Sequence, residues 1–252
     1  MQTLDRKKIA ILYICTGKYI MFLNQFIESA EDYLLTNSTK EYFIFTDFEF
    51  NEMPDERMHI ISQSKLGWPY DTLKRYNMFL KIKEQLKDFD YVFFYNANSS
   101  FQIPVTEEDI LPTEEDNWLT GVIHSGYCGL PSNQLNFEKN KNSTAYIDIE
   151  NKSLYYYQGA LFGGKTNEFI ELCETLDNNI EKDLENDIIA IWHDESHLNC
   201  YFNTVKKPKQ LHSYYSYPEL APVSPYIPIV SHPIKTIQLD KNRLGGHDFL
   251  RS

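Results

Sequence analysis

The stretch that most constrains the fold is the apolar run at residues 89–95 (FDYVFFY), which ends abruptly in the polar segment 96–100 (NANSS). A short run of aromatic and β-branched residues is typical of a buried strand. Small polar side chains compete with regular backbone hydrogen bonding, so the polar segment predicts a turn. Ligands of open α/β sheets bind where strands end at their carboxyl edge, so we expect a ligand site here. An ordinary strand followed by a polar turn is the alternative.

Strand and helix patterns alternate along the first hundred residues. Apolar or alternating runs predict strands, whereas apolar residues at spacings of three and four predict helices. The resulting order is strand, helix, strand, strand, helix, strand, which is typical of an α/β nucleotide-binding half. The strands are expected at residues 8–14, 41–48, 58–62 and 89–95, and the helices at residues 19–35 and 70–87.

The rest of the chain is less regular but shows no linker, repeat or break in composition. We therefore expect one α/β domain, residues 1–252, with a nucleotide-binding half at about 8–101 and a second half at about 102–240. Residues 241–252 contain two glycines and few apolar side chains, so a mobile tail is expected there. The later elements are expected as strands at 118–124 and 154–164, a helix at 166–181 with Thr166 as N-cap, and a helix at 188–202.

Charge and hydropathy limit the possible partners. The 252 residues carry a formal net charge of −12, which argues against nucleic acid or an anionic membrane as the main partner. No run approaches the roughly 18–20 apolar residues of a membrane span, and no apolar signal-peptide core follows the basic N-terminus. The four cysteines are widely spaced and fit a reducing compartment. These features predict a soluble cytoplasmic protein.

The densest set of functional groups is the segment from Trp192 to His197 (WHDESH). His193 and His197 share one face of a predicted helix, so a zinc site must be considered. Zinc proteases place Glu directly after the first His, whereas Asp194 stands there, and the sequence nearby offers no third ligand. A solvated helix start, with acidic residues complementing the dipole, is a second interpretation. A third is a sugar site, where an indole stacks on a pyranose and carboxylates offset charge at an anomeric carbon.

Small residues interrupt the predicted strand at 154–164, at residues 158–160 (QGA) and again at 163–164 (GG). Such residues among Tyr, Leu and Phe indicate that something approaches the backbone closely. Either a ligand or a helix packed tightly on the sheet would explain them.

Basic side chains offer candidates for a phosphate site. Gly17, Lys18 and Tyr19 place a turn, a cation and an aromatic ring at the end of the first strand, a combination suited to a nucleotide base and phosphate. Lys74 and Arg75, on the predicted long helix, are the best internal cations for a diphosphate. An ordinary strand-end glycine and exposed helical charges are the alternatives.

Together these segments resemble glycosyltransferase family 6, which includes the histo-blood-group A and B transferases, the α-1,3-galactosyltransferase and bacterial relatives. The similarity extends from about residue 9 to about residue 239. Its most specific part is the segment 192–199 (WHDESHLN), which accompanies the Tyr-Tyr and Phe-Gly-Gly pattern of residues 155–164. The other matching stretches are residues 17–19 with 22–30, 68–75, 90–91 and 124–129.

The resemblance implies a GT-A fold, with a Rossmann-like nucleotide-binding half and a mixed central sheet in a single domain. It also implies transfer of galactose or N-acetylgalactosamine (GalNAc) from UDP to the 3-hydroxyl of a galactoside, with retention at the anomeric carbon. UDP would bind in the first half, and the acceptor and catalytic groups would lie in the second.

The resemblance further implies roles for individual residues. Glu195 would be the catalytic carboxylate and would face the acceptor beside Trp192 and His124. Tyr19 would face uracil, and Arg75 would face the donor's sugar and diphosphate. Residues 158–160 fall where the family distinguishes an acetamido group from a hydroxyl at C2 of the donor. The expected donor-binding residues are Lys18, Tyr19, Arg75, Asn96, Asn98, Gln158, Gly159, Ala160, His193, Asp194 and Lys241.

The sequence departs from the family at residues 96–98 (NAN), where animal members carry Asp-x-Asp to hold manganese on the diphosphate. Neutral amide oxygens are poor ligands for a hard cation without charged neighbours. Losing two anions together with one dication leaves the local charge unchanged. We therefore expect a bacterial member without metal or other cofactor, in which protein cations stabilise the departing UDP. The candidate cations are Lys18, Arg75, Lys241 and Arg243.

The expected substrates follow from the same comparison. Gly159 beside Ala160 leaves room for an acetamido group, which favours UDP-GalNAc over UDP-galactose. His124 and the blood-group branch of the family favour a fucosylated galactoside, Fucα1-2Gal, as acceptor. An α-1,3-galactosyltransferase that uses UDP-galactose is the alternative enzyme. A catalytically inactive carbohydrate-binding relative and a zinc hydrolase are the alternatives from other classes.

Overall fold

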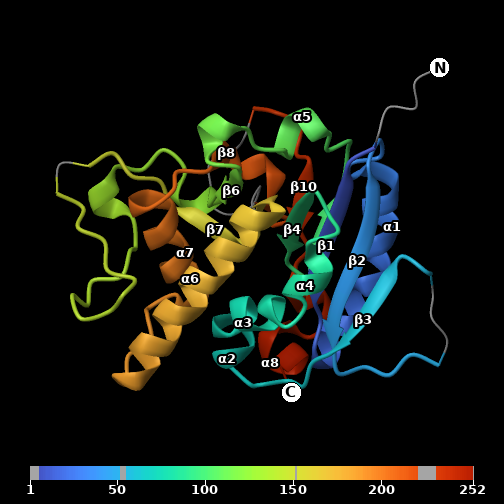
Figure 1. Ribbon diagram of the computed structural model, residues 1–252, viewed down its shortest axis with the longest axis horizontal. Helices are drawn as coiled ribbons and strands as arrows, with labels where there is room; N and C mark the ends of the chain where they lie inside the picture. Colours follow the sequence, from blue (N-terminus) through green and yellow to red (C-terminus); the bar gives the residue numbers. More distant parts are fainter. Residues whose placement is uncertain (1–5, 52–54, 151, 221–230, 252) are drawn as a thin grey trace.

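The structure is a computed structural model that describes residues 6–51, 55–150, 152–220 and 231–251. A seven-stranded sheet in the order β3-β2-β1-β4-β7-β6-β8 runs through it (Figure 1). Strands β1 to β4 pair in parallel, β7 runs antiparallel to β4 and β6, and β8 is parallel to β6. The expected α/β fold with a mixed central sheet is therefore confirmed. The strands are β1 (Lys8–Ile14), β2 (Thr39–Thr46), β3 (Met58–Ser62), β4 (Tyr91–Tyr95), β6 (Leu119–Ile123), β7 (Tyr157–Lys165) and β8 (Lys209–Leu211).

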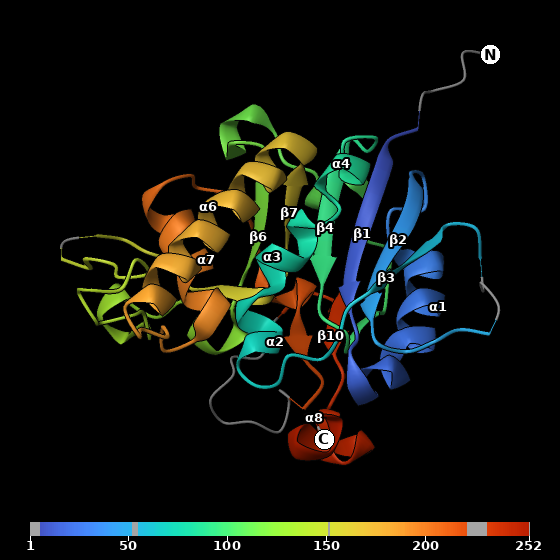
Figure 2. The ribbon, with the colours of Figure 1, turned by 60° about the horizontal axis from the view of Figure 1, so that its bottom comes forward.

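Helices cover both faces of this sheet (Figures 1 and 2). Successive side chains of a strand point to opposite faces, so neighbouring residues of β4 show the division. Phe93 belongs to the apolar cluster of Phe26 in α1, whereas Phe94 packs against Phe79 in α3. The long helices are α1 (Leu23–Tyr33) on one face, and α6 (Thr166–Glu185) and α7 (His193–Thr204) on the other with α3 (Arg75–Leu80).

The prediction of one long helix before β4 is wrong, because the chain forms three short helices there. The backbone is non-helical at Lys74 and at Ile82. The buried side chains Leu73, Tyr76, Phe79 and Ile82 recur at a spacing of three residues. A straight α-helix turns about 100° per residue, so such a row would drift by about 60° per step away from the sheet. The breaks keep these side chains in the core. The three helices are α2 (Tyr70–Leu73), α3 and α4 (Lys83–Leu86).

Other boundaries differ from expectation by a few residues. β3 has the expected bounds, whereas β2 begins earlier and both β7 and α7 begin later than expected. Ser99 and Ser100, expected in a turn, belong to a strand. Thr166 is the first residue of α6 and not its N-cap, which is Lys165. The Thr166 hydroxyl instead donates to the Phe89 carbonyl at 2.6 Å and so links the start of α6 to the residues just before β4.

A second, three-stranded sheet, β5-β10-β9, connects the polar segment after β4 to the C-terminal region. The chain then folds back, and Leu250 is fully buried beside Phe22 and Leu239. Figure 2 shows α8 on the side toward which β1 and β4 point. The structure thus folds residues 241–251 against η1, and the mobility expected for this tail stays a prediction. The elements are β5 (Ser99–Phe101), β9 (Tyr217–Pro218), β10 (Thr236–Gln238), η1 (Gly17–Phe22), η7 (Lys241–Leu244) and α8 (Gly246–Arg251).

Short helices occupy the connections between the strands and helices of the second half. The short helices are α5 (Glu107–Ile110), η2 (Glu114–Asp116), η3 (Ser125–Tyr127), η4 (Ser132–Gln134) and η5 (Ser213–Tyr215).

None of the helices in the described ranges is long and apolar enough to cross a membrane.

Candidate active site

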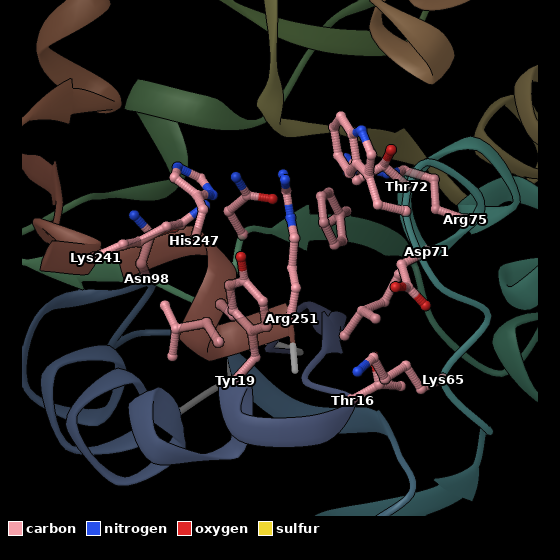
Figure 3. Close-up of a pocket in the computed structure, with 16 residues that line it drawn as sticks. Thr16, Tyr19, Lys65, Asp71, Thr72, Arg75, Asn98, Lys241, His247 and Arg251 are labelled. Atoms are coloured by element: carbon pink, nitrogen blue, oxygen red, sulfur yellow. The ribbon is translucent and has the colours of Figure 1, made fainter. Parts of the chain in front are cut away.

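A cavity of about 270 Å³ lies at the carboxyl ends of β1 and β4. Segments far apart in the sequence line it: η1, the turn into α2 and α3, the residues after β4, and the C-terminal η7 and α8 (Figure 3). The described residues of its wall include the cations Lys65, Arg75, Lys241 and Arg251, against the single carboxylate of Asp71. This cavity is therefore suited to an anion, although the whole chain has a net charge of −12.

Arg75, the first residue of α3, is only 6% exposed. Its Nη1 donates to the Gly159 carbonyl at 2.6 Å, and its Nε lies 3.1 Å from Asp194 Oδ2. The alternative of an exposed helical charge is therefore wrong for Arg75. Lys74 instead pairs with Glu181 of α6, so this second candidate cation faces away from the cavity.

The C-terminal segment closes one side of the first cavity with cations that contact aromatic rings. The Arg251 guanidinium stacks 3.8 Å from the centroid of the Trp68 ring, and Arg251 also hydrogen-bonds Tyr19. The Lys241 ammonium lies 5.3 Å from the Tyr19 ring centroid. Burial, with the charges of Arg251 and Arg75, lowers the pKa of Lys241 to about 8. These cations repel one another, and a bound anion would relieve the repulsion.

The two amides that follow β4 both line the first cavity, but their surroundings differ. Asn98 is buried, and its Nδ2 donates to the Leu239 carbonyl at 2.9 Å, beside the end of β10. The Asn96 backbone N–H donates to the Ala160 carbonyl of β7 at 2.9 Å. The oxygens of two neutral amides are poor ligands for a hard divalent cation. In the parts of the chain that the structure describes, no three His, Cys, Asp or Glu side chains are grouped to hold a metal ion.

A second cavity, of about 200 Å³, adjoins the first and shares Trp68, Thr72, Arg75 and Asn96 with it. The structure brings most of the expected sugar-handling residues together in its wall. Its other lining residues are His124, Gln158, Gly159, Ala160, Trp192, His193, Asp194 and Glu195.

Glu195, near the start of α7, lines this second cavity. Its Oε2 accepts a hydrogen bond from the Gly159 backbone at 2.7 Å, and the Tyr156 hydroxyl also bonds the carboxylate. Burial, helped by the neighbouring Asp194 charge, raises the pKa of Glu195 to about 7. Burial also raises the pKa of Asp194, although Arg75 opposes that shift. A carboxylate that ionises near neutral pH is suited to catalysis.

His124, after β6, and Trp192, before α7, both line the second cavity. The Nδ1 atom of His124 accepts a hydrogen bond from the Gly126 backbone at 3.0 Å. Burial lowers the pKa of His124 to about 4. The ring is therefore neutral at pH 7 and carries its hydrogen on Nε2. Trp192 is 44% exposed, so its indole lies at the rim.

His193 and His197 have separate surroundings, which gives the zinc hypothesis no support. His193 packs edge-on against Trp68, with 4.6 Å between the ring centroids, and lines the second cavity. His197 is 1% exposed, and its Nε2 lies 3.7 Å from Asp183 Oδ2 in the interior. Asp194 is also buried, so the interpretation of a solvated helix start is wrong as well.

Two of the expected cations lie outside both cavities. The Lys18 ammonium lies over the Phe249 ring, 3.8 Å from its centroid. Arg243 pairs with Glu219 at 2.7 Å. Lys18 therefore does not line either cavity, and its expected role in donor binding stays a prediction.

Sequence reasoning assigned no role to several side chains that line the cavities or contact Glu195. Asp71, Thr72 and Tyr156 lie in stretches that resemble the family, so the resemblance could have indicated them. Lys65, His247 and Arg251 have no sequence motif around them.

Comparison with known proteins identifies the family. The model of glycosyltransferase family 6 matches residues 2–243. The O-antigen biosynthesis glycosyltransferase WbnI of Escherichia coli is 37% identical over 214 residues, which are 84% of this chain and 88% of that protein. Globoside α-1,3-N-acetylgalactosaminyltransferase 1 of Gallus gallus is 30% identical over 93% of this chain and 67% of its own length. Histo-blood group ABO system transferase 2 of Rattus norvegicus is 28% identical over 81% of this chain and 61% of its own length. The family model covers nearly the whole chain and these relatives agree with it, so the chain belongs to glycosyltransferase family 6.

Proposed function

We propose that this glycosyltransferase moves GalNAc from UDP-GalNAc, in α-1,3 linkage and with retention, to a galactoside acceptor such as Fucα1-2Gal, without a divalent metal. The observation that carries this proposal is the junction of the two cavities at Arg75. Cations suited to a diphosphate lie on one side of the junction, and the Glu195 carboxylate lies on the other. A donor that spans it would hold its anomeric carbon between leaving group and carboxylate.

The first cavity accounts for the nucleotide. Tyr19 offers an aromatic surface to uracil, while Arg75, Lys241 and Arg251 offer positive charge to the diphosphate. Preorganised charge at the point where the leaving group becomes more negative is usually the largest electrostatic contribution to catalysis. In this site that charge comes from side chains of the protein.

The second cavity accounts for the transfer step. As the bond to UDP breaks, positive charge develops at the anomeric carbon, and Glu195 on the opposite face either stabilises it or bonds to it transiently. The acceptor hydroxyl then attacks from the side that UDP left, so the configuration is retained. Its proton passes to the departing diphosphate, the base on that side.

The remaining residues of the second cavity suit sugar binding. His193 and Asp194 lie beside Arg75 and would bind hydroxyls of the donor sugar. His124 can donate from Nε2 to the acceptor, and the exposed indole of Trp192 can stack on a pyranose at the rim. An inactive carbohydrate-binding relative would have no use for a carboxylate placed as Glu195 is.

Gln158 supports GalNAc as the donor sugar. Its Oε1 is buried and has no hydrogen-bond partner among the described residues, and Gln158 lines the second cavity. A buried acceptor without a partner is costly, and the N–H of an acetamido group would satisfy it. UDP-galactose, which carries a hydroxyl in place of the acetamido group, is the second candidate donor. The Gallus gallus relative is named as an α-1,3-N-acetylgalactosaminyltransferase, in agreement with the first candidate.

A parallel assay of both donors tests the proposed function. UDP-GalNAc and UDP-galactose are each incubated with the protein and a Fucα1-2Gal glycoside, and the product is measured by mass spectrometry and its linkage by NMR. We expect an α-1,3-linked product and a kcat/KM at least ~10-fold higher for UDP-GalNAc, because its acetamido group fills the space beside Gly159 and its N–H can pair with Gln158 Oε1. A preference for UDP-galactose would select the second candidate. The absence of product from either donor, with UDP bound, would contradict the proposed activity.

A further inference from the structure

Next to the second cavity, one edge of the chain at the start of β7 has no neighbouring strand. Its backbone N–H and C=O groups therefore need other hydrogen-bond partners. The Tyr156 carbonyl accepts from the His124 N–H at 2.8 Å, so Tyr156 faces β6. In an extended chain the adjacent residues Tyr155 and Tyr157 then turn their N–H and C=O groups to the opposite side. β4 does not reach them, because its pairing with β7 covers only Leu161–Lys165. Tyr157 is only 1% exposed, so its backbone groups in particular require partners.

Two asparagines of α7 supply those partners in the same way. Asn199 Oδ1 accepts from the Tyr157 N–H at 2.7 Å, and its Nδ2 donates to the Tyr157 carbonyl at 2.8 Å. Asn203 Oδ1 accepts from the Tyr155 N–H at 3.1 Å, and its Nδ2 donates to the Tyr155 carbonyl at 2.9 Å. Each side-chain amide thus forms the pair of hydrogen bonds that a neighbouring strand would form.

Glu195 forms the third rung of the same ladder. Its Oε2 accepts from the Gly159 N–H at 2.7 Å, and Arg75 donates to the Gly159 carbonyl at 2.6 Å. Residues 195, 199 and 203 follow one another at four-residue steps on the helix, which rise about 6 Å each. Residues 159, 157 and 155 follow at two-residue steps on the extended chain, which span about 6.6 Å each. The two spacings agree closely enough for three consecutive rungs.

The ladder is also linked along the helix. Besides Tyr157, the Asn199 amide donates to the Glu195 carbonyl at 2.9 Å. The Asn203 amide donates in turn to the Asn199 carbonyl at 2.8 Å. Asn199 is fully buried and stands between the outer rung and Glu195, so it joins the backbone that carries the carboxylate to the strand beneath it.

We propose that Asn199 is a positioning residue of the transfer reaction: it fixes the register of α7 on β7 and so holds the Glu195 carboxylate against the wall of the sugar cavity. This role rests on the function proposed above for Glu195. Apolar neighbours such as Leu198 and Phe202 hold α7 to the sheet, but apolar packing alone tolerates small shifts along the helix. Directional hydrogen bonds such as these rungs do not tolerate such shifts. A displacement of about 1 Å at a reacting group can lower the rate ~100-fold.

The test compares Asn199→Asp with Asn203→Asp, two isosteric changes that remove the donors from an inner and an outer rung. We expect Asn199→Asp to lower kcat at least ~10-fold and Asn203→Asp to lower it much less. The UDP dissociation constant should change less than about twofold in both, because the cations of the first cavity are untouched. A purely structural role predicts instead that each variant loses thermal stability while its folded fraction keeps the wild-type kcat. If Asn199→Asp does not fold, Asn199→Ser, whose hydroxyl can keep one hydrogen bond of the rung, takes its place.

A double-mutant cycle separates this proposal from the proposed function. If Asn199 acts through Glu195, its substitution should have little further effect on the residual rate of Glu195→Gln. Additive losses, or a normal kcat in the Asn199 variant beside a slow Glu195→Gln, would overturn the positioning role alone. A normal rate in Glu195→Gln would overturn the catalytic role of Glu195 and, with it, the reason for the ladder.

Discussion

Lys241 should take up a proton when UDP binds. In the structure, burial together with Arg251 and Arg75 lowers its pKa from 10.5 to about 8. One pKa unit corresponds to about 1.4 kcal/mol, so these surroundings cost the charged ammonium roughly 3 kcal/mol relative to water. A diphosphate next to Lys241 would offset that cost and raise the pKa again.

The sign and size of the effect follow from this shift. Because the pKa rises on binding, the complex holds more protons than the free protein at every pH between the two values. At pH 8 about half of the free molecules carry a charged Lys241, so UDP binding should take up about half a proton. The phosphates of UDP are fully ionised at this pH and do not contribute.

Isothermal titration calorimetry at pH 8, in two buffers of different ionisation enthalpy, measures the uptake directly. Lys241→Met should abolish it and weaken UDP binding at least ~10-fold, since a charge-assisted hydrogen bond contributes about 1.5–3 kcal/mol. Lys241→Arg keeps the charge but does not titrate, so it should bind UDP without uptake. Equal uptake in wild type and Lys241→Met, or none in wild type, would refute the placement of Lys241 beside the diphosphate.

Three further changes probe the active site and the fold. The kcat/KM should rise with pH through about 7, because Glu195 must be ionised to act and its pKa is about 7. Glu195→Gln should remove this pH dependence and lower kcat at least ~1000-fold with UDP still bound. An unchanged pH profile in the variant would contradict the catalytic role of Glu195. Arg75→Lys cannot keep both the Gly159 and the Asp194 contacts and should lower kcat/KM about 100-fold in steady-state assays. A near-normal kcat/KM would show that the reaction does not need both contacts of the guanidinium group. Lys40→Met removes an ammonium that bonds the Ala30 and Leu34 carbonyls at the end of α1, and the Ala30 carbonyl keeps the Leu34 N–H as a donor. Because the Leu34 carbonyl loses this partner, the free energy of unfolding in urea should fall by about 1–3 kcal/mol, while a wild-type midpoint would show that water replaces the ammonium.

The sequence was most informative where one local pattern decides one element. The order of strands in the first half and the bounds of β3 follow from apolar runs that only a buried strand accommodates. The long helix before β4 failed because apolar residues spaced by three and by four look alike in a short window. Only the sheet underneath decides that Leu73, Tyr76 and Phe79 must all face inward.

The site was predictable as a set of residues but not as a geometry. Lys74 and Arg75 are adjacent cations of similar helical preference, and only the break at Lys74 sends Arg75 inward while Lys74 meets Glu181. The C-terminal cations reach the cavity through long-range packing of Leu250, which no local pattern reveals. The rungs formed by Asn199 depend on where β4 ends relative to β7, a property of the sheet and not of α7.

The measurement that tests the central claim most directly is the rate of transfer from UDP-GalNAc to a Fucα1-2Gal glycoside in excess EDTA. Neutral amides at residues 96 and 98 and a wall of protein cations predict the same rate with and without the chelator, and no increase on adding manganese. A rate that EDTA abolishes and manganese restores would contradict the account, because the divalent ion, and not Arg75, Lys241 and Arg251, would then stabilise the departing UDP.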